Sequence, residues 1–298
     1  MIHPSEKAEQ AVAKFQFINS IDLFAGQGNS TKMKLFMPQI NGREFDVLSI
    51  QESLMEVLIG FSLSRITVEK YEKDSRWARL SKEARKKFRD YSSNKGELGE
   101  LFLYTFLEGE LGAPQILSKM SLKTTAGDYT KNSDGIHYFK LPNSNRYHLI
   151  FGEAKMYRDI VSGFRDAFES ISNHKAGKEF EKSLISSQIE SEFSDSVDKK
   201  LINAILYPHE NGSNIKVSDA FGIFVGFEID DSAGKTKTED EYEEWMKQTI
   251  IDTVKSKVTT IERHITSNKL IGNNFYVYLM PFVDMDKTRT EITKGVTE

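Results

Sequence analysis

The sequence has no cysteine among its 298 residues, which excludes disulfides and thiolate metal sites. It also lacks an apolar run near the roughly 20 residues that cross a bilayer. The first residues, 1–6, do not have the pattern of a signal peptide. The six histidines are scattered without the spacing of metal ligands. With 39% hydrophobic residues, enough for a packed core, we expect a globular cytoplasmic protein.

The sequence also lacks a strong excess of either charge, because its formal net charge is only −4. That value argues against a nucleic-acid partner at first sight, but the charges are unevenly distributed. Residues 61–90 hold ten Lys or Arg against five Asp or Glu, hence +5, whereas residues 228–244 hold eight acids against two lysines, hence −6. Separated patches let one side of the protein hold a polyanion or a protein partner.

Part of the basic segment forms one helical face. Residues 70–90 are predicted as an amphipathic helix that carries Arg76, Arg79 and Lys86 on its polar side. We interpret these three residues as a candidate DNA- or partner-binding surface. A solvated helix face without a function is the alternative interpretation.

Two segments with strand character carry the most informative residues. The first, residues 133–139, is bounded by turn residues on both flanks. The second, residues 147–156, alternates so that Glu153 and Lys155 point to the same side. We expect the two strands to pair in antiparallel fashion, which would bring Asp134 near Glu153. A cross-strand ion pair at a sheet edge would also explain these charges, but placing them among apolar residues costs desolvation and so indicates a functional site.

Two carboxylates and a lysine at neighbouring strand positions suit phosphodiester hydrolysis. Carboxylate oxygens are ligands for Mg²⁺, which takes the rest of its shell from water and substrate phosphates. The ion would lower the pKa of a bound water, hold the scissile phosphate and offset charge on the leaving oxygen. Lys155 would supply a fixed positive charge beside the attacking water or the developing negative charge.

A helix that precedes these strands offers a further acid. Residues 95–111 have apolar positions over most of the helix circumference, so we expect a largely buried helix. Its narrow polar arc carries Glu97, Glu100, Tyr104 and Glu108. A carboxylate on that arc is well placed to join a metal site on an adjacent sheet. Alternatively, these acids stabilise the helix N-terminus through its dipole.

The order of the patterns predicts an α/β fold with a mixed sheet flanked by helices. Residues 1–90 are predicted as a helix-rich N-terminal region and residues 91–298 as a second domain. In the first region we expect helices at 6–17, 51–66 and 70–90 and strands at 34–38 and 44–48. In the second we expect strands at 115–122, 133–139, 147–156, 220–229 and 275–283, and helices at 95–111, 159–174, 178–191, 197–206 and 239–268.

This order, with Glu on the first helix, Asp on the second strand and Glu-x-Lys on the third, resembles the PD-(D/E)xK restriction-endonuclease-like superfamily. Ser133 stands where the superfamily usually has proline, a common departure. The motifs are also similar to the HamA family, the nuclease subunits of the bacterial Hachiman anti-phage defence system, over roughly residues 92–283. The stretches that carry this similarity are Lys95-Gly96-Glu97-Leu98-Gly99-Glu100-Leu101-Phe102-Leu103-Tyr104, Ser133-Asp134-Gly135-Ile136-His137 and Gly152-Glu153-Ala154-Lys155.

The resemblance implies roles for individual residues and for partners. It implies metal ligands at Asp134 and Glu153, a catalytic lysine at Lys155 and a first-helix acid at Glu97 or Glu100. We prefer Glu100, because Gly96-x-x-x-Glu100 is similar to the glycine-to-glutamate spacing of resolvase-like members. The resemblance further implies Mg²⁺ or Mn²⁺ as cofactor, DNA as substrate, the superfamily 2 helicase HamB as partner and a bacterial cytoplasmic location.

Our leading hypothesis is a metal-dependent DNA nuclease that acts as the effector of a two-component defence system. No sequence-reading element is recognisable, and an unrestrained non-specific nuclease would destroy host DNA, so we expect the helicase to restrain it. One alternative is a catalytically silent nuclease-like subunit that binds DNA or docks the helicase, which the presence of Asp134, Glu153 and Lys155 disfavours. The other is a stand-alone restriction or junction nuclease.

Overall fold

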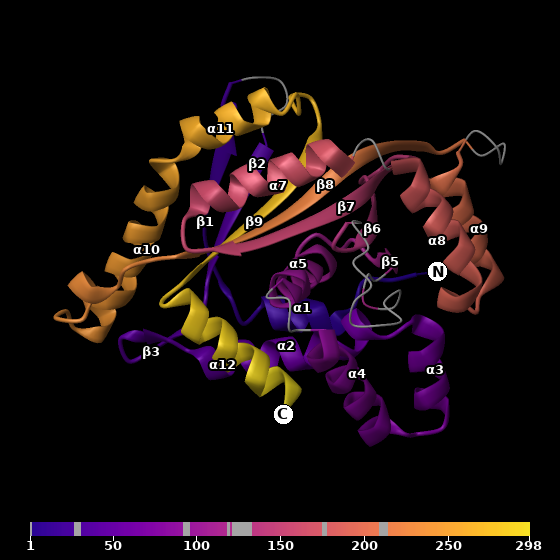
Figure 1. The fold of residues 1–298 in the computed structure, drawn as a ribbon, viewed down its shortest axis with the longest axis horizontal. Coiled ribbons are helices and arrows are strands. Elements are labelled where there is room, and N and C mark those ends of the chain that lie inside the picture. The colour runs from indigo at the N-terminus through magenta and orange to yellow at the C-terminus, as the bar shows by residue number, and fades with distance from the viewer. Residues whose placement is uncertain are drawn as a thin grey trace.

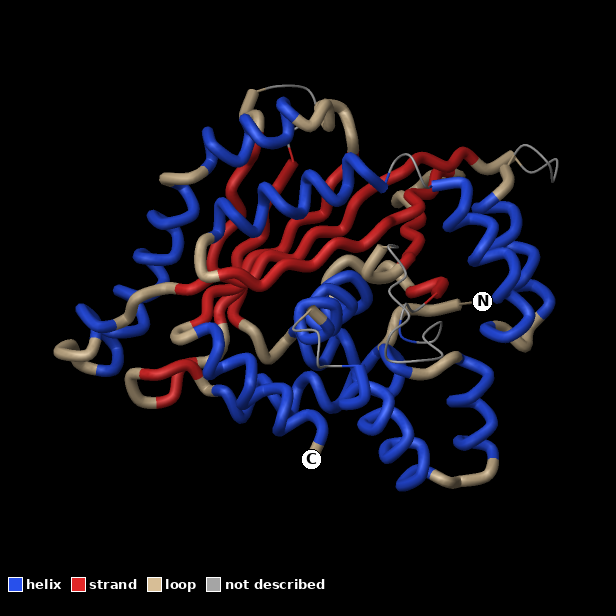
Figure 2. The backbone as a smooth tube through the Cα atoms, viewed as in Figure 1, coloured by secondary structure: helices blue, strands red, loops and turns tan. Residues whose placement is uncertain are grey.

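The main sheet is mixed and contains strands from both ends of the chain. The computed structural model describes residues 2–26, 31–91, 96–117, 120, 133–174, 178–208 and 214–298. In these residues seven strands form one sheet between helical layers (Figure 1; Figure 2), which confirms the predicted mixed α/β class. The strands, in their order across the sheet, are β1 (Gln16–Leu23), β2 (Thr31–Met37), β9 (Asn274–Phe282), β8 (Lys216–Glu228), β7 (Arg146–Tyr157), β6 (Ile136–Lys140) and β5 (Gln115–Leu117).

The centre of the sheet is parallel and its edges are antiparallel. Strands β7, β8, β9 and β2 pair in parallel, whereas β6 and β5 on one side and β1 on the other pair in antiparallel fashion. Strand β7 is paired along its whole length with β8, with Glu153 beside Ile223 and Lys155 beside Val225. Strand β7 is an internal strand, paired with β6 over residues 147–151 and with β8 over its whole length, including Glu153 and Lys155.

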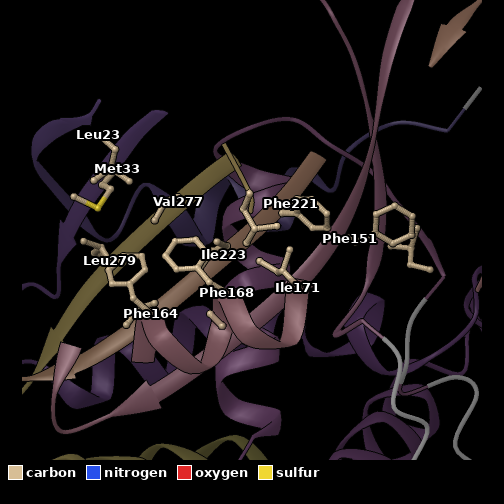
Figure 3. Close-up of a cluster of buried hydrophobic side chains, with 14 of the residues drawn as sticks. Leu23, Met33, Phe151, Phe164, Phe168, Ile171, Phe221, Ile223, Val277 and Leu279 are labelled. Carbon is tan, nitrogen blue, oxygen red and sulfur yellow. The ribbon is translucent and has the colours of Figure 1, made fainter. Parts of the chain in front are cut away.

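Helices cover each face of the sheet. One face is covered by α7 (Ile160–His174), α10 (Glu239–Lys255) and α11 (Val258–Ser267). Phe151, Phe164, Phe168, Phe221 and Ile223 belong to the core between that layer and the sheet (Figure 3). The opposite face is covered by α5 (Glu97–Gly109), behind which lie α1 (Glu6–Val12), α2 (Val47–Ser62), α4 (Trp77–Tyr91) and α12 (Met285–Thr297). The remaining elements are β3 (Ile40–Asn41), β4 (Glu44–Phe45), α3 (Arg65–Lys73), α8 (Lys178–Glu192), α9 (Ser196–Leu206) and the 3-10 turn Ser232–Gly234.

Helix α5 lies close to the sheet because small residues face each other across the contact. A Cβ atom on Gly99 would lie 3.4 Å from the Cβ of Ala154, and one on Gly152 would lie 2.9 Å from Leu103 Cδ2. Phe102 stacks on Phe224 with ring centroids 5.1 Å apart, a contact worth about 0.5–1.5 kcal/mol beyond its buried area. Every residue from Glu97 to Glu108 is buried, which confirms the expected core helix.

The N-terminal region contributes two strands to the same sheet. We predicted a boundary between residues 90 and 91, but β2 pairs in parallel with β9, so the sheet crosses that boundary. The helix expected at 6–17 ends at Val12, and β1 begins at Gln16 because its residues pair with β2. The strand expected at 44–48 ends at Phe45, since Asp46 caps α2 by accepting a hydrogen bond from the Ser49 amide at 3.0 Å.

Two long helical patterns are broken in the structure. Residues 70–90 span the end of α3 and most of α4, with Ser75 at a positive φ of 55° in the turn between them. Residues 239–268 form α10 and α11, which are separated at Ser256 and Lys257. Helix α12 was not predicted. The strand expected at 115–122 ends at Leu117 as β5, and residues 118, 119, 121 and 122 lie outside the described residues.

No single helix in the described part of the chain is long and apolar enough to cross a membrane. One pair, α2 and α3, passes that test only when taken together, across a bend of 106°.

Candidate active site

The two strands that carry the candidate residues pair as the sequence predicts. Strands β6 and β7 are antiparallel with Ile136 opposite Phe151, and Asp134 lies two residues before the start of β6. Backbone hydrogen bonds extend the pairing, because the Asp134 amide donates to the Gly152 carbonyl and the Gly152 amide to the Gly135 carbonyl, both at 2.9 Å. The predicted antiparallel pairing is confirmed.

The backbone of β7 holds the carboxylate of Asp134. Its Oδ2 atom accepts a hydrogen bond from the amide of Ala154 at 2.8 Å, a charge-assisted bond between the two strands. The next residue, Gly135, has a φ of +155°, and a Cβ atom there would lie 3.2 Å from Gln115 Nε2. Glycine therefore lets the chain turn into β6 with Asp134 directed at the middle of the Gly152–Lys155 segment.

Glu153 and Lys155 form an ion pair on the same face of β7. Lys155 Nζ lies 2.6 Å from Glu153 Oε1, with side chains 22% and 14% exposed. Burial alone would lower the pKa of Lys155, but the Glu153 carboxylate, with a further contribution from Asp134, outweighs burial and raises that pKa above its usual value. The lysine is therefore held as an ammonium between two carboxylates.

The two candidate glutamates of α5 lie on a different layer. Alternation in β7 places Glu153 and Lys155 on the face toward α7, where the Cβ of Lys155 lies 3.8 Å from the position of a Cβ on Gly163. Helix α5 packs instead on the face that carries Gly152, Ala154 and Met156. Glu97 and Glu100 stand in its first turn and are only 2% and 5% exposed. Their role as metal ligands stays a prediction.

The arc of α5 that we expected to be polar is buried against the N-terminal segment and β5. Glu108 accepts hydrogen bonds from the amides of Ser5 at 2.7 Å and Gln115 at 2.6 Å. Burial raises the pKa of the Glu108 carboxyl, while nearby Arg65 and these two hydrogen bonds oppose the rise. This acid has a structural task that helix periodicity alone could not reveal, because both donors come from other elements.

Sequence reasoning did not predict that His137 is buried on the opposite face of β6 from the candidate residues. Its side chain is buried two residues after Gly135 on β6, and its Nδ1 atom lies 2.8 Å from the Ala113 carbonyl oxygen. Burial lowers the pKa of His137 to about 4, although the hydrogen bond to Ala113 acts in the opposite direction. The signal in the sequence was its parity with Gly135, which places both on the α5 face of the strand pair.

The basic residues of the predicted binding surface lie apart from these strands, on the α3–α4 hairpin. Arg76 precedes α4 and forms a 3.6 Å ion pair with Asp74, and Arg79 forms one of the same length with Glu83. Lys86 is exposed on α4.

The donor set fits a hard divalent cation such as Mg²⁺. Within the described residues no three or more His, Asp or Glu side chains come close enough together to hold a metal ion. Asp134 and Glu153 provide two carboxylates, both close enough to Lys155 to raise its pKa. Mg²⁺ commonly binds through one or two carboxylates and completes its shell with water and phosphate oxygens, so two are sufficient.

A mixed sheet flanked by helices makes this an α/β protein, and the arrangement is consistent with a nuclease-like fold. The family model of HamA matches residues 15–296, nearly the whole chain, and the protein belongs to the HamA family. This membership supports a role in Hachiman antiviral defence. A search of curated proteins finds no match.

Proposed function

We propose that this protein is a Mg²⁺-dependent deoxyribonuclease, the effector of a Hachiman complex in which a HamB-like superfamily 2 helicase restrains it. The observation that carries this proposal is the grouping of Asp134, which directly precedes β6, with Glu153 and Lys155 of β7. The lysine and the glutamate form an ion pair, and the Asp134 carboxylate accepts a hydrogen bond from the Ala154 amide between them. An ion pair with no further task would not need a second carboxylate facing it, and desolvating three charges costs free energy.

Each residue has a distinct task in the proposed reaction. Asp134 and Glu153 would hold the metal, which when bound supplies Lewis-acid polarisation of the scissile phosphate and a more acidic water. The Ala154 amide fixes Asp134, so little reorganisation of that carboxylate is needed. Lys155, which the nearby carboxylates hold as an ammonium, stabilises the negative charge that develops on the phosphate oxygens.

A cleavage assay on the purified protein tests the proposal. Linear and supercoiled DNA are incubated with the chain in Mg²⁺ or in EDTA, with and without the helicase partner. We expect Mg²⁺-dependent degradation that is lost in Glu153→Ala, and a fall of about 10²–10³-fold in Lys155→Ala, the usual effect of removing one electrostatic stabiliser. Glu169→Ala removes an exposed glutamate of α7 and serves as the matched control with wild-type activity.

The same assay separates the proposal from its main alternative. Wild-type cleavage by the Glu153→Ala and Lys155→Ala variants would show that another site or a contaminant cuts the DNA. Absence of cleavage under every condition, with intact binding to DNA or helicase, would support a catalytically silent nuclease-like subunit.

A further inference from the structure

The hairpin formed by α3 and α4 is a basic surface that the proposed chemistry does not use. Figure 1 shows both helices projecting from the body of the protein on the side of α2. Helix α3 contains no fully buried residue. Among the described side chains of α4, a single stripe is buried, and it consists of Leu80, Ala84 and Phe88. The remaining described residues of the hairpin are partly or fully exposed.

Three cations occupy the side of α4 opposite its buried stripe. At about 100° per residue, Arg79, Lys82 and Lys86 fall within roughly 60° of one another. All three are exposed. We call them the basic stripe. By helix periodicity the two acids of α4, Glu83 and Asp90, fall outside this arc, about 40° and 20° beyond Arg79.

The charges of the basic stripe are poorly compensated within the protein. Arg79 has one exposed ion pair, 3.6 Å from Glu83, and such exposed pairs contribute little. In the described part of the chain Lys82 and Lys86 form no ion pair, and like charges four residues apart on a helix repel each other. An anionic ligand would relieve this repulsion without breaking a strong contact.

The length and surroundings of the basic stripe fit a nucleic-acid backbone. Seven residues of helix separate Arg79 from Lys86, which at 1.5 Å per residue is about 10 Å, roughly the axial rise of three nucleotides of a duplex at 3.4 Å each. Trp77 is 54% exposed at the tip of the same hairpin, beside Arg76. An exposed indole next to a guanidinium offers a surface on which a base can stack.

We propose that the basic stripe of the α3–α4 hairpin is a DNA-backbone binding surface that holds substrate outside the cleavage site. The choice of DNA as the ligand rests on the proposed nuclease function. The contacts expected from the basic stripe are to phosphates, so binding is independent of sequence and strongly dependent on salt.

Fluorescence anisotropy of labelled DNA tests this surface without any cleavage. The full-length chain is titrated in EDTA against a fluorescein-labelled duplex of mixed sequence, and against its single strand, at several salt concentrations. The variant is Lys82→Ala/Lys86→Ala. Its matched control is Lys287→Ala/Lys294→Ala, which removes two exposed lysines from α12. Far-UV circular dichroism checks that each variant keeps its helices.

We expect wild-type affinity to fall steeply with salt. The Lys82/Lys86 variant should bind more weakly on every sequence, with a log–log salt slope smaller by about 1.8, roughly 0.9 for each lost phosphate contact. The α12 control should match the wild type. An unchanged affinity and slope in the Lys82/Lys86 variant would overturn the proposal. So would normal DNA binding together with lost binding to the helicase, which would make the hairpin a protein interface.

Binding and cleavage fail independently in this design. A chain that binds DNA through the basic stripe in EDTA but never cuts it in Mg²⁺ supports this inference and contradicts the proposed nuclease. A chain that cuts DNA equally well without Lys82 and Lys86, and binds it equally well, contradicts the inference alone.

Discussion

At Lys155, burial and nearby charge act in opposite directions, and charge prevails. The pKa of Lys155 is raised because the Glu153 and Asp134 carboxylates stabilise the ammonium more than burial destabilises it. Its contribution to stability is therefore fully present below the usual pKa of 10.5 and is lost only as pH rises through the higher folded value. At neutral pH the site keeps a fixed positive charge, so Lys155 is suited to charge stabilisation rather than to proton transfer.

His137 responds to pH in the opposite sense. Its pKa falls to about 4 in the folded protein from 6.5. As pH drops below 6.5, His137 becomes protonated in the unfolded chain but stays neutral in the folded chain until about pH 4. The free energy of unfolding therefore decreases across this pH range. At about 1.4 kcal/mol per pH unit, the loss is about 3 kcal/mol.

Urea unfolding between pH 7 and pH 4 measures this effect. His137→Asn keeps an amide donor for the Ala113 carbonyl but cannot titrate. We expect its stability to fall less steeply with decreasing pH than that of the wild type, while His3→Asn, at an exposed histidine, follows the wild-type curve. Parallel curves for His137→Asn and the wild type would show that His137 does not carry the acid sensitivity.

At the scale of elements, α5 packs against the face of β7 opposite to Glu153 and Lys155 and so supports the strand that carries them. Gly152 is the residue of β7 to which Asp134 donates its backbone hydrogen bond, and it also faces Leu103 of α5. A Cβ atom at position 152 would meet Leu103 Cδ2 at 2.9 Å and the Gly135 carbonyl oxygen at 3.1 Å. The first neighbour can move, but the second belongs to the turn that follows Asp134.

We therefore expect Gly152→Ala to destabilise the protein by about 1–3 kcal/mol, the usual effect of overpacking, and to lower cleavage more than stability alone explains. Combining it with Leu103→Ala removes one of the two close contacts. The double variant should be less destabilised than the sum of the single variants, as measured by urea unfolding in a double-mutant cycle. Strict additivity would mean that Leu103 does not limit the space at Gly152.

The parts of the site that the sequence predicted are those built from local patterns. Asp134 directly precedes β6, and Glu153 and Lys155 lie on β7, which a short turn joins to β6, so alternation and turn residues together predict the pairing of the two strands. The layer of Glu97 and Glu100 depends on which face of the sheet α5 covers, and no local pattern contains that information. Likewise, β2 pairs with β9 more than two hundred residues later, so its place in the sheet could not be read from its own residues.

At the scale of the whole molecule, opposite charges gather at well-separated places. The segment 228–244, with its charge of −6, includes the start of α10, and Figure 1 shows α10 far from the α3–α4 hairpin. A polyanion attracted to the basic stripe would be repelled from the α10 end. If DNA binds as proposed, such an arrangement would orient it on the protein before any specific contact forms.

Contacts to DNA phosphates do not distinguish one sequence from another, so the proposed nuclease cannot spare host DNA by itself. We therefore expect the helicase partner to restrain it. If the helicase restrains the nuclease, the isolated chain should cleave DNA faster than the complex does before any trigger. The rate of the isolated chain divided by that of the complex should be roughly 5–150, the factor that typical coupling energies of about 1–3 kcal/mol between two sites produce. Initial rates on linear DNA, measured for both preparations at equal chain concentration, give this ratio directly, and a complex built with Glu153→Ala corrects for cleavage by contaminants. Equal rates for chain and complex would mean that restraint does not come from the helicase, because a bound partner that leaves the rate unchanged has no differential effect on the active state.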